Sequence, residues 1–363
     1  MKKILVATGG GDCPGLNAVI RGIVKRASRE EDWEVWGSYE ALNGLMEEPT
    51  RLIRLDDKAV SGIHVLGGTI IGTTNKGNPM SYPEKQADGT IKLTNRIPWL
   101  VDRLKSHGFD AVINIGGDGS QAISQAMFEA GMPVVGVPKT IDNDLNSTDF
   151  TFGFQTAVQT ASDSFDRLVT TASSHHRVMI MEVMGRNAGW IALYTAISGG
   201  AEICLIPEIP YDLSAVIRRI KSRYNNGRGF VNIVIAEGAH AKEGSITSTL
   251  GEEGRHAVRL GGVCFTLSQQ LKEAGIEADI RETVLGHTQR GGTPVAFDRV
   301  IASVFGVKAM ELVLDGKFGQ LVVLQNNDFT SVPIKEAISA YNVVNPNGTL
   351  VKAAKGLGIS FGD

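Results

Sequence analysis

The stretch that decides the fold is residues 111–144, AVINIGGDGSQAISQAMFEAGMPVVGVPKTIDND. Two short apolar runs, Ala111–Ile115 and Pro133–Val137, are rich in Val and Ile and bounded by Gly and Pro, which is typical of buried strands. The segment between them predicts a helix over Gln121–Ala130. It is too long for a hairpin, so we expect a right-handed parallel βαβ unit. Both loops after the strands then lie at one sheet edge, where open α/β sheets bind ligands.

The residues of these two loops indicate phosphoryl-transfer chemistry. The turn Gly116–Ser120 is glycine-rich and precedes a helix, so its backbone can approach an anion closely. Asp118 within it would repel phosphate unless a cation lay between them, and Mg²⁺ is the usual cation on phosphates. In the second loop, Lys139 supplies a positive charge and Asp142 is placed to accept a proton from a hydroxyl. These are the components of phosphoryl transfer. Their combination favours this function over the alternative of two ordinary βα turns with solvated aspartates.

Length and composition set the class of protein. With 363 residues, the chain has room for two domains or one large α/β unit with two lobes. The net charge of −3 gives no electrostatic case for nucleic acid or an anionic membrane, and no apolar run approaches a membrane span. Three widely spaced cysteines without metal-ligand spacing indicate reduced thiols, so we expect a cytoplasmic protein.

Two further glycine turns suit phosphate binding. GGGDCPG at 9–15 follows a strand predicted at Lys3–Thr8 and precedes a helix predicted at Leu16–Arg26. It lacks GK[ST] and is not GxGxxG, so neither a Walker loop nor a dinucleotide fingerprint fits. A glycine and threonine loop at 67–77 could shelter phosphate through backbone N–H groups. Recurring strand, glycine turn and helix predict an α/β fold of two Rossmann-like lobes, with mostly parallel sheets flanked by helices.

These motifs together resemble the phosphofructokinase family. GGDGS followed by PKTIDND carries the resemblance, and it implies phosphoryl transfer to the 1-hydroxyl of fructose 6-phosphate. NAD kinases and diacylglycerol-type lipid kinases also have GGDG-like turns, so that turn alone does not decide. GGGDCPGLNAVIR at 9–21 resembles the nucleotide-binding opening of the family. The resemblance spans roughly residues 3–330 and implies the phosphofructokinase fold.

The resemblance implies a donor site in the first lobe, with Mg²⁺ on Asp118 and ATP as phosphoryl donor. The family has an arginine where this chain has Asn75. Lys76 offers a positive charge beside it, but a lysine does not copy a guanidinium fork, so the arginine's role does not transfer directly. The expected donor-binding residues are Gly11, Asn75, Lys76, Gly117, Asp118, Gly119 and Ser120.

The second half of the chain resembles the family's acceptor site. Thr140, Ile141 and Asp142 resemble the segment that grips the reacting end of the sugar, with Asp142 as catalytic base. Lys139 and Arg186 are expected to stabilise the charge of the transferring group. A phosphate monoester dianion favours several cations and bidentate arginines. The other expected sugar-phosphate ligands are Arg177, Met184, Gly185, Glu237, Arg281, His287 and Arg290.

The family's pattern also implies an oligomer and a choice of donor. Arg177 and Arg281 correspond to arginines contributed by a neighbouring subunit, so we expect a homodimer or homotetramer. The residue after the GGD aspartate separates donors in the family: glycine leaves room for the α-phosphate of a nucleotide, and aspartate marks pyrophosphate enzymes. Gly119 therefore favours ATP. Lys139 is usual in pyrophosphate enzymes but also occurs with glycine in the mixed-substrate ATP group, which this chain most resembles.

We therefore predict a glycolytic ATP-dependent 6-phosphofructokinase. A pyrophosphate-dependent fructose 6-phosphate 1-phosphotransferase, a kinase of another sugar phosphate such as sedoheptulose 7-phosphate, an NAD kinase and a catalytically silent subunit are the alternatives. The expected division is 1–150 for the donor lobe, 151–330 for the sugar-phosphate lobe and 331–363 for a C-terminal extension that adds little.

Three local predictions complete the sequence-based picture. Residues 78–95 and 240–255 are expected to be surface loops. The adjacent His175 and His176 precede a predicted strand and could not easily share one metal ion, because neighbouring strand residues point to opposite faces. Bacterial relatives have an effector site, and the residues that fit parts of its pattern are Arg21, Arg54, Glu202 and Arg228. Ordinary surface charges explain these four residues at least as well.

Overall fold

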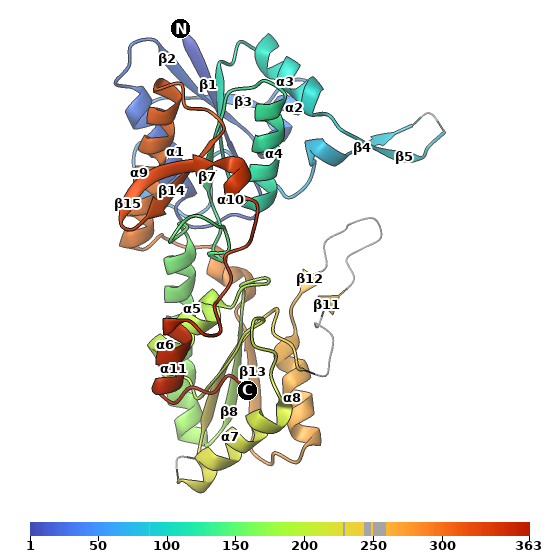
Figure 1. The fold of residues 1–363 in the computed structure, drawn as a ribbon, viewed down its shortest axis with the longest axis vertical. Coiled ribbons are helices and arrows are strands. Elements are labelled where there is room, and N and C mark those ends of the chain that lie inside the picture. Colours follow the sequence, from blue (N-terminus) through green and yellow to red (C-terminus); the bar gives the residue numbers. More distant parts are fainter. Residues whose placement is uncertain (87, 228, 243–247, 250–258) are drawn as a thin grey trace. The chain divides into compact units, whose positions relative to one another are not determined.

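The computed structural model describes residues 1–363 apart from 87, 228, 243–247 and 250–258. The chain forms two compact units. Unit 1 consists of residues 1–141, 145–156 and 290–341, and unit 2 of residues 142–144, 157–289 and 342–363. Each unit contains its own sheet, so the two are described separately (Figure 1).

The sheet of unit 1 has seven strands in the order β15-β14-β7-β6-β1-β2-β3. The five central strands are parallel, and β3 and β15 pair antiparallel at the two edges. The predicted βαβ unit is therefore confirmed in its centre. The strands are β1 (Lys2–Thr8), β2 (Trp33–Ser38), β3 (Leu52–Leu55), β6 (Ala111–Gly116), β7 (Val134–Pro138), β14 (Gln320–Gln325) and β15 (Asp328–Pro333).

Helices cover both faces of this sheet, as the burial of its central strands requires. Leu5 and Ala7 of β1 pack in one core cluster with Leu100, Leu104 and Met127, which belong to α3 and α4. Side chains alternate along a strand, so the residues between them face α1 and α9 on the other side (Figure 1). The helices are α1 (Leu16–Ala27), α2 (Asn43–Met46), α3 (Ile97–Ser106), α4 (Asp118–Glu129), α9 (Ala296–Leu314) and α10 (Ile334–Ala337).

Unit 2 is built on four parallel strands in the order β13-β8-β10-β9. Apolar residues of α7 and α8 pack on one face of this sheet, and α6 contacts β9 and β10. Its strands are β8 (Val178–Val183), β9 (Ile203–Leu205), β10 (Val231–Ala236) and β13 (Ile280–Val284), with the short pair β11 (Ser248–Thr249) and β12 (Arg259–Leu260). Its helices are α5 (Phe154–His175, which begins in unit 1), α6 (Trp190–Gly199), α7 (Leu213–Asn225), α8 (Val263–Glu273) and α11 (Thr349–Gly356).

The division of the chain differs from the sequence-based one. Residues 290–330 were expected in the second lobe and 331–363 in an extension, but 290–341 pack in unit 1. The physical reason is strand pairing: β14 extends the first sheet by pairing with β7, and α9 packs along α1. Such long-range pairing leaves no local signal in the sequence.

Several local predictions are refined by the structure. Residues 78–95 hold η2 (Pro79–Ser81) and a hairpin of β4 (Tyr82–Lys85) and β5 (Ile91–Thr94), so the expected surface excursion has regular structure. His175 is the last residue of α5, and His176 follows with φ +55°, so neither lies on a strand. Of the loop expected at 240–255, the larger part lies outside the described residues.

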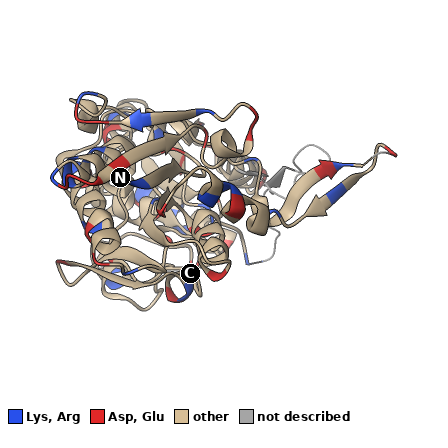
Figure 2. Ribbon diagram, turned by 90° about the horizontal axis from the view of Figure 1, so that it is seen from above, with Lys and Arg blue, Asp and Glu red and all other residues tan. Residues whose placement is uncertain are grey.

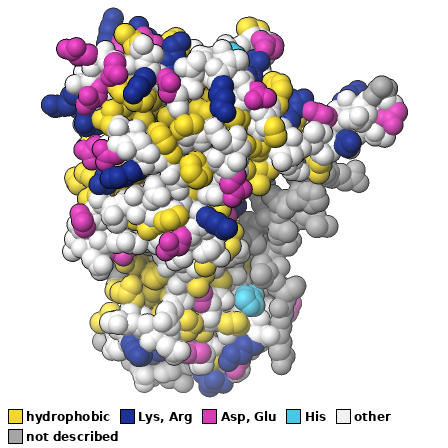
Figure 3. Space-filling view, turned by 45° about the horizontal axis from the view of Figure 1, so that its top comes forward, with side chains coloured by type: hydrophobic (Ala, Val, Ile, Leu, Met, Phe, Trp, Pro, Cys, Tyr) yellow, Lys and Arg dark blue, Asp and Glu magenta, His cyan; other side chains and the backbone are white. Residues whose placement is uncertain are grey.

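Charged residues of both signs are mixed in the two views of the described residues (Figure 2 and Figure 3). Acidic and basic residues alternate along the ribbon, including on the β4–β5 hairpin (Figure 2). On the face in Figure 3, basic, acidic and hydrophobic side chains are interspersed. Among the described residues, no helix is both long enough and apolar enough to cross a bilayer.

Candidate active site

Three loops meet at the carboxyl ends of β1 and β6 in unit 1. The Gly10 N–H donates to the carbonyl of Thr74 (3.1 Å), and the Thr73 hydroxyl donates to the carbonyl of Gly10 (2.6 Å). The Gly9 N–H donates to the carbonyl of Ile115 (2.9 Å) at the end of β6. The glycine loops at 9–15 and 67–77 are thus hydrogen-bonded to each other, and Gly9 lies beside Ser120 of the turn at 116–120. These three loops are called the cradle below, and they are the loops predicted to form the donor site.

Gly11 lies directly against the guanidinium group of Arg290. A Cβ at this position would be 2.9 Å from Nη1 of Arg290, and the same Nη1 donates to the carbonyl of Asp12 (3.3 Å). Arg290 therefore packs its guanidinium on the loop of the predicted donor site, within unit 1. It was expected among the ligands of the sugar 6-phosphate, and its place beside Gly11 is a contact that sequence analysis did not foresee.

Lys139 also reaches into this cradle. It is 4% exposed, and its Nζ donates to the carbonyl of Gly11. Its own backbone N–H donates to the carbonyl of Gly116 (3.0 Å). The ammonium of Lys139 therefore lies among the glycine loops, beside the predicted donor site.

Asp118 is the first residue of α4 and is partly exposed at the amino end of that helix. The predicted turn thus continues into the helix three residues earlier than expected. The positive end of the helix dipole stabilises an ionised carboxylate here. No group of three or more His, Cys, Asp or Glu is placed to hold a metal in the described part of the chain. Asp118 offers a single carboxylate, and Mg²⁺ commonly takes one or two carboxylates and completes its shell with water and substrate phosphates, so this side chain has the chemistry of the predicted Mg²⁺ ligand.

Gly119 faces open space. A Cβ built on it meets no atom within 4 Å, so the residue is not required by packing. The absence of a side chain therefore leaves room beside Asp118, in accordance with the argument that glycine at this position admits a nucleotide.

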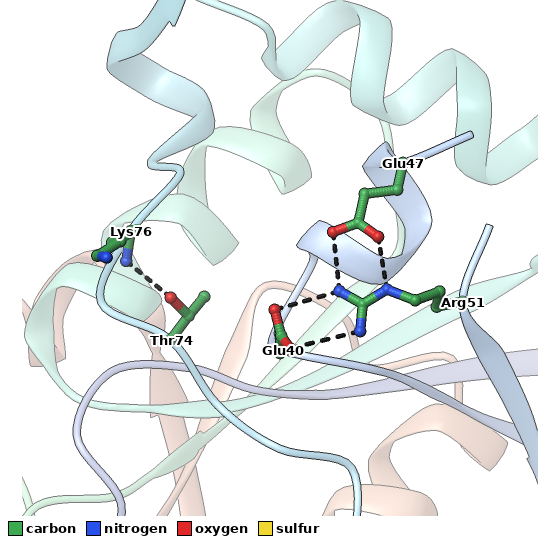
Figure 4. Close-up of polar contacts among 5 residues, drawn as sticks. All are labelled: Glu40, Glu47, Arg51, Thr74 and Lys76. Carbon is green, nitrogen blue, oxygen red and sulfur yellow. Dashed lines mark hydrogen bonds and ion pairs between the residues drawn. The ribbon is translucent and has the colours of Figure 1, made fainter. Parts of the chain in front are cut away.

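Asn75 and Lys76 belong to the 67–77 loop of the cradle. Asn75 Oδ1 is 4.0 Å from the position of a Cβ on Gly10. The backbone N–H of Lys76 donates to Thr74 Oγ1 (3.0 Å), and the Lys76 side chain is exposed (Figure 4). Both residues thus border the predicted donor site, which is the position expected for the family's arginine.

One arginine is paired with two carboxylates near this loop. Arg51 Nη2 lies 2.8 Å from Glu47 Oε1 and 3.1 Å from Glu40 Oε2 (Figure 4). The backbone N–H of Glu40 donates to the carbonyl of Ile71 (2.9 Å). Because Glu40 is attached to the loop in this way, the Arg51 partner offsets acidic charge that would otherwise repel an anion there.

The second predicted loop is firmly braced. Thr151 Oγ1 donates to the carbonyl of Thr140 (2.7 Å), and Ile141 is fully buried. Asp142, the predicted base, is 3% exposed. Thr140 and Ile141 belong to unit 1 and Asp142 to unit 2, so the loop itself carries the chain from one unit to the other.

In unit 2, Met184–Arg186 forms a strained turn at the end of β8. Arg186 has φ +51°, a left-handed conformation that is uncommon for a residue with a side chain. Its backbone N–H donates to Glu237 Oε1 (2.9 Å). Glu237 follows β10, the neighbour of β8. Two of the predicted sugar-binding groups are therefore in direct contact.

A buried glutamine joins a third strand to this turn. Gln289 is fully buried, and its Oε1 accepts the N–H of Met184 (2.9 Å). It lies in η3 (Gly286–Arg290) after β13, two residues beyond the exposed His287. The turn with Arg186, Glu237 and the segment of His287 thus gather at the carboxyl ends of adjacent strands. Sequence analysis missed Gln289 because one glutamine in a glycine turn has no pattern of its own.

Arg177 and Arg281 share one carboxylate. Arg177 Nε and Arg281 Nη1 each lie 2.7 Å from an oxygen of Asp279. The two side chains therefore present two guanidinium groups side by side. This geometry brings together the arginines predicted for the 6-phosphate, and Asp279 is the partner that sequence analysis missed.

The segment after α10 also touches predicted functional groups. The Tyr341 hydroxyl donates to Asp118 Oδ2 (2.9 Å). In unit 2, Glu208 Oε1 accepts the N–H groups of Gly189 (2.9 Å) and Val344 (2.8 Å). Burial raises the pKa of Glu208, and these hydrogen bonds partly oppose the rise. The prediction that the last thirty residues add little is therefore corrected.

Two of the residues that fitted parts of an effector site, Glu202 and Arg54, are paired within the protein. Glu202 is paired with Arg223 and accepts the N–H of Asn232 (2.8 Å). Arg54 lies 3.3 Å from Glu34, while Arg228 lies outside the described residues. Glu202 thus has a structural role within unit 2.

Comparisons with known proteins agree with this geometry. The sequence profile described as Phosphofructokinase matches residues 3–313. ATP-dependent 6-phosphofructokinase 1 of Synechocystis sp. is 45% identical over 364 residues, covering 100% of this chain and 99% of that protein. Pyrophosphate–fructose 6-phosphate 1-phosphotransferase of Streptomyces coelicolor is 45% identical over 349 residues, covering 95% and 96%.

The fold is shared with solved structures as well. The crystal structure of pyrophosphate-dependent phosphofructokinase from Marinobacter aquaeolei superposes with a TM-score of 0.79 at 22% identity, covering 95% of this chain and 86% of that one. At this identity the likeness concerns the fold alone. The profile match and the full-length matches in sequence show that the chain belongs to the phosphofructokinase family.

Proposed function

We propose that this protein is an ATP-dependent 6-phosphofructokinase, which transfers the γ-phosphoryl group of ATP to the 1-hydroxyl of fructose 6-phosphate. The observation that carries the proposal is the cradle in unit 1. Three glycine loops converge with the ammonium of Lys139 and the carboxylate of Asp118 at one sheet edge. The full-length similarity to a protein named ATP-dependent 6-phosphofructokinase supports the same activity.

The proposed roles follow from charge and placement. Backbone N–H groups of the glycine loops bind the donor phosphates. Asp118 would hold Mg²⁺, which when bound offsets phosphate charge. Asp142 accepts the proton of the attacking hydroxyl, while Lys139 and Arg186 stabilise charge on the transferring group. In unit 2, Glu237 binds sugar hydroxyls and His287 binds the 6-phosphate, to which a neighbouring subunit contributes its paired Arg177 and Arg281. Arg290, predicted for the same phosphate, lies in unit 1 beside Gly11.

A matrix of donors and acceptors tests the proposal. Initial rates are measured with MgATP and Mg-pyrophosphate as donors, against fructose 6-phosphate, sedoheptulose 7-phosphate and NAD. We expect the highest kcat/KM for MgATP with fructose 6-phosphate. A higher value for another acceptor, or no turnover with any pair, would refute the proposed substrate.

The base assignment has its own test. Asp142→Asn removes the proton acceptor but keeps the side chain's size, so kcat should fall by about 10³-fold while fructose 6-phosphate still binds. Direct binding is measured by calorimetry. Near-native turnover of Asp142→Asn would show that Asp142 is not the base.

Pyrophosphate as donor is the second candidate, and one observation favours it. The Lys139 ammonium sits against Gly11 in the donor cradle, where it could bind a short inorganic donor. The open space at Gly119 favours ATP instead, and we give it greater weight because a nucleotide needs that room. A cytoplasmic homodimer or homotetramer, with the acceptor site shared between subunits, completes the proposal and rests on the family resemblance.

A further inference from the structure

We propose that Tyr341 is a positioning residue for Asp118, and that it sets how tightly the enzyme holds the divalent cation that accompanies the phosphoryl donor. This inference rests on the proposed function, because it assigns a partner to the carboxylate predicted to hold that cation. It concerns the phenol hydroxyl of Tyr341 and one oxygen of Asp118.

The contact itself is well formed. The Tyr341 hydroxyl donates to Asp118 Oδ2 at 2.9 Å, between residues 223 positions apart in the sequence. Tyr341 is 56% exposed, so its ring contributes little to the hydrophobic core of unit 1. A large aromatic residue at the surface that aims its polar group at a predicted metal ligand is better explained by that ligand than by packing.

The backbone that carries Tyr341 is held in place. Within unit 1, Tyr341 forms an antiparallel bridge with Leu145. Within unit 2, the next residue, Asn342, is bound through three groups. Its N–H donates to the carbonyl of Asp144 (2.9 Å), its side-chain amide donates to the carbonyl of Asn143 (2.9 Å), and its own carbonyl accepts from Trp190 Nε1 (2.9 Å). Within unit 1, the bridge to Leu145 therefore holds the backbone that presents the phenol to Asp118.

The partners of Tyr341 and Asn342 lie in the loop that follows the predicted base. Asn143, Asp144 and Leu145 directly follow Asp142 in the sequence. The C-terminal segment thus contacts the end of the loop that carries the base and, through Tyr341, the carboxylate predicted to hold the cation. Sequence analysis assigned no role to this segment.

The chemical effect follows from the geometry of a carboxylate. An ionised carboxylate has two oxygens and about four acceptor positions, so one hydrogen bond fixes its rotation without exhausting it. Partners in the outer shell of a metal ligand commonly change metal affinity by about 10–100-fold. Because Tyr341 is more than half exposed, we expect the lower end, about tenfold.

Cation binding is measured directly, with Mn²⁺ in place of Mg²⁺. The full-length enzyme is saturated with a non-hydrolysable ATP analogue, and free Mn²⁺ is counted by its electron paramagnetic resonance signal. Tyr341→Phe removes only the hydroxyl, and we expect a dissociation constant for Mn²⁺ about tenfold higher. Tyr224→Phe is the matched control, since the Tyr224 hydroxyl donates to the carbonyl of His176 (2.8 Å) in unit 2, and it should leave Mn²⁺ binding unchanged.

A double-mutant cycle separates positioning from general damage. Asp118→Asn should weaken Mn²⁺ binding by itself, and Tyr341→Phe added to it should cause no further loss, since its partner is already removed. The inference is overturned if Tyr341→Phe and the wild type bind Mn²⁺ equally well, or if the wild type binds no Mn²⁺. It is also overturned if Tyr341→Phe weakens Mn²⁺ binding as much in the Asp118→Asn background as in the wild type. None of these results concerns the acceptor, so failure of the proposed function is recognised separately: Mn²⁺ binds, yet fructose 6-phosphate is not phosphorylated.

Discussion

Asp298 should be among the most important polar residues for the stability of unit 1. It is fully buried, and its Oδ2 accepts both the N–H (2.7 Å) and the hydroxyl (2.6 Å) of Thr156. Thr156 lies in the first turn of α5, and its hydroxyl oxygen in turn accepts the N–H of Val295 (3.0 Å). The carboxylate thus joins the start of one helix to the start of another, α9, in which Asp298 itself lies.

The magnitude follows from the bonds that are lost. A hydrogen bond to a charged acceptor contributes about 2 kcal/mol, so two such bonds lost in Asp298→Ala give about 4 kcal/mol of destabilisation. That is a large part of the about 5–15 kcal/mol that stabilises a typical protein. Urea unfolding followed by tryptophan fluorescence measures it. The control is Asp315→Ala at the end of the same helix, where both partners of the Asp315–Lys317 pair are exposed, so its effect should be within about 0.5 kcal/mol.

The same carboxyl should leave a signature in the dependence of stability on pH. Burial raises the pKa of Asp298 above its ordinary value of 3.8. As pH rises from 3.8 to the raised value, the unfolded chain releases this proton before the folded one, so the wild type loses stability relative to Asp298→Asn across that window and the difference is constant above it. The reasoning would be refuted if Asp298→Ala lowered the free energy of unfolding by less than about 1 kcal/mol. It would also be refuted if the wild type gained stability relative to Asp298→Asn as pH rises.

The remaining predictions concern the site. Gly119→Asp should lower kcat/KM with MgATP by at least about a hundredfold, because a second carboxylate enters the phosphate site. The melting temperature should be unchanged, because a side chain at this position meets no other atom. An unaltered kcat/KM with MgATP would show that Gly119 does not border the donor phosphates. Asp279→Ala, which releases Arg177 and Arg281 from their shared partner, should raise KM for fructose 6-phosphate by about fivefold with kcat preserved, whereas an unchanged KM would separate these arginines from the phosphate. Glu208→Gln should cost only about 1 kcal/mol in urea unfolding, since one oxygen accepts both N–H groups, and Glu208→Ala should cost more; equal losses in the two variants would contradict this.

The parts of the fold with local signals could be predicted from the sequence. The short Val- and Ile-rich runs and the glycine turns located β1, α1, β6 and β7 to within one or two residues. Helix α4 begins at Asp118, earlier than expected, because Asp118 and Gly119 adopt a helical conformation although glycine is unfavourable within helices. The family that these turns predicted is confirmed by the profile match over residues 3–313.

Tertiary pairing explains what the sequence could not show. The return of residues 290–341 to unit 1 depends on β14 choosing β7 as its neighbour. The Tyr341–Asp118 contact joins residues too far apart for any periodic pattern to link. Asp279 between two arginines looked like any other surface acid. The predicted roles of the site residues remain predictions, since they concern ligands and chemistry.

The route of the chain between the units restricts how this protein can be divided. It passes from one to the other at 141/142, 144/145, 156/157, 289/290 and 341/342. No single cut therefore releases an intact half: a fragment that stops near residue 150 would lack the β14 edge and the α9 cover of its own sheet. Chimaeras between this enzyme and its relatives should accordingly exchange 1–156 and 290–341 as a set, and crossovers at one junction alone should yield aggregated protein.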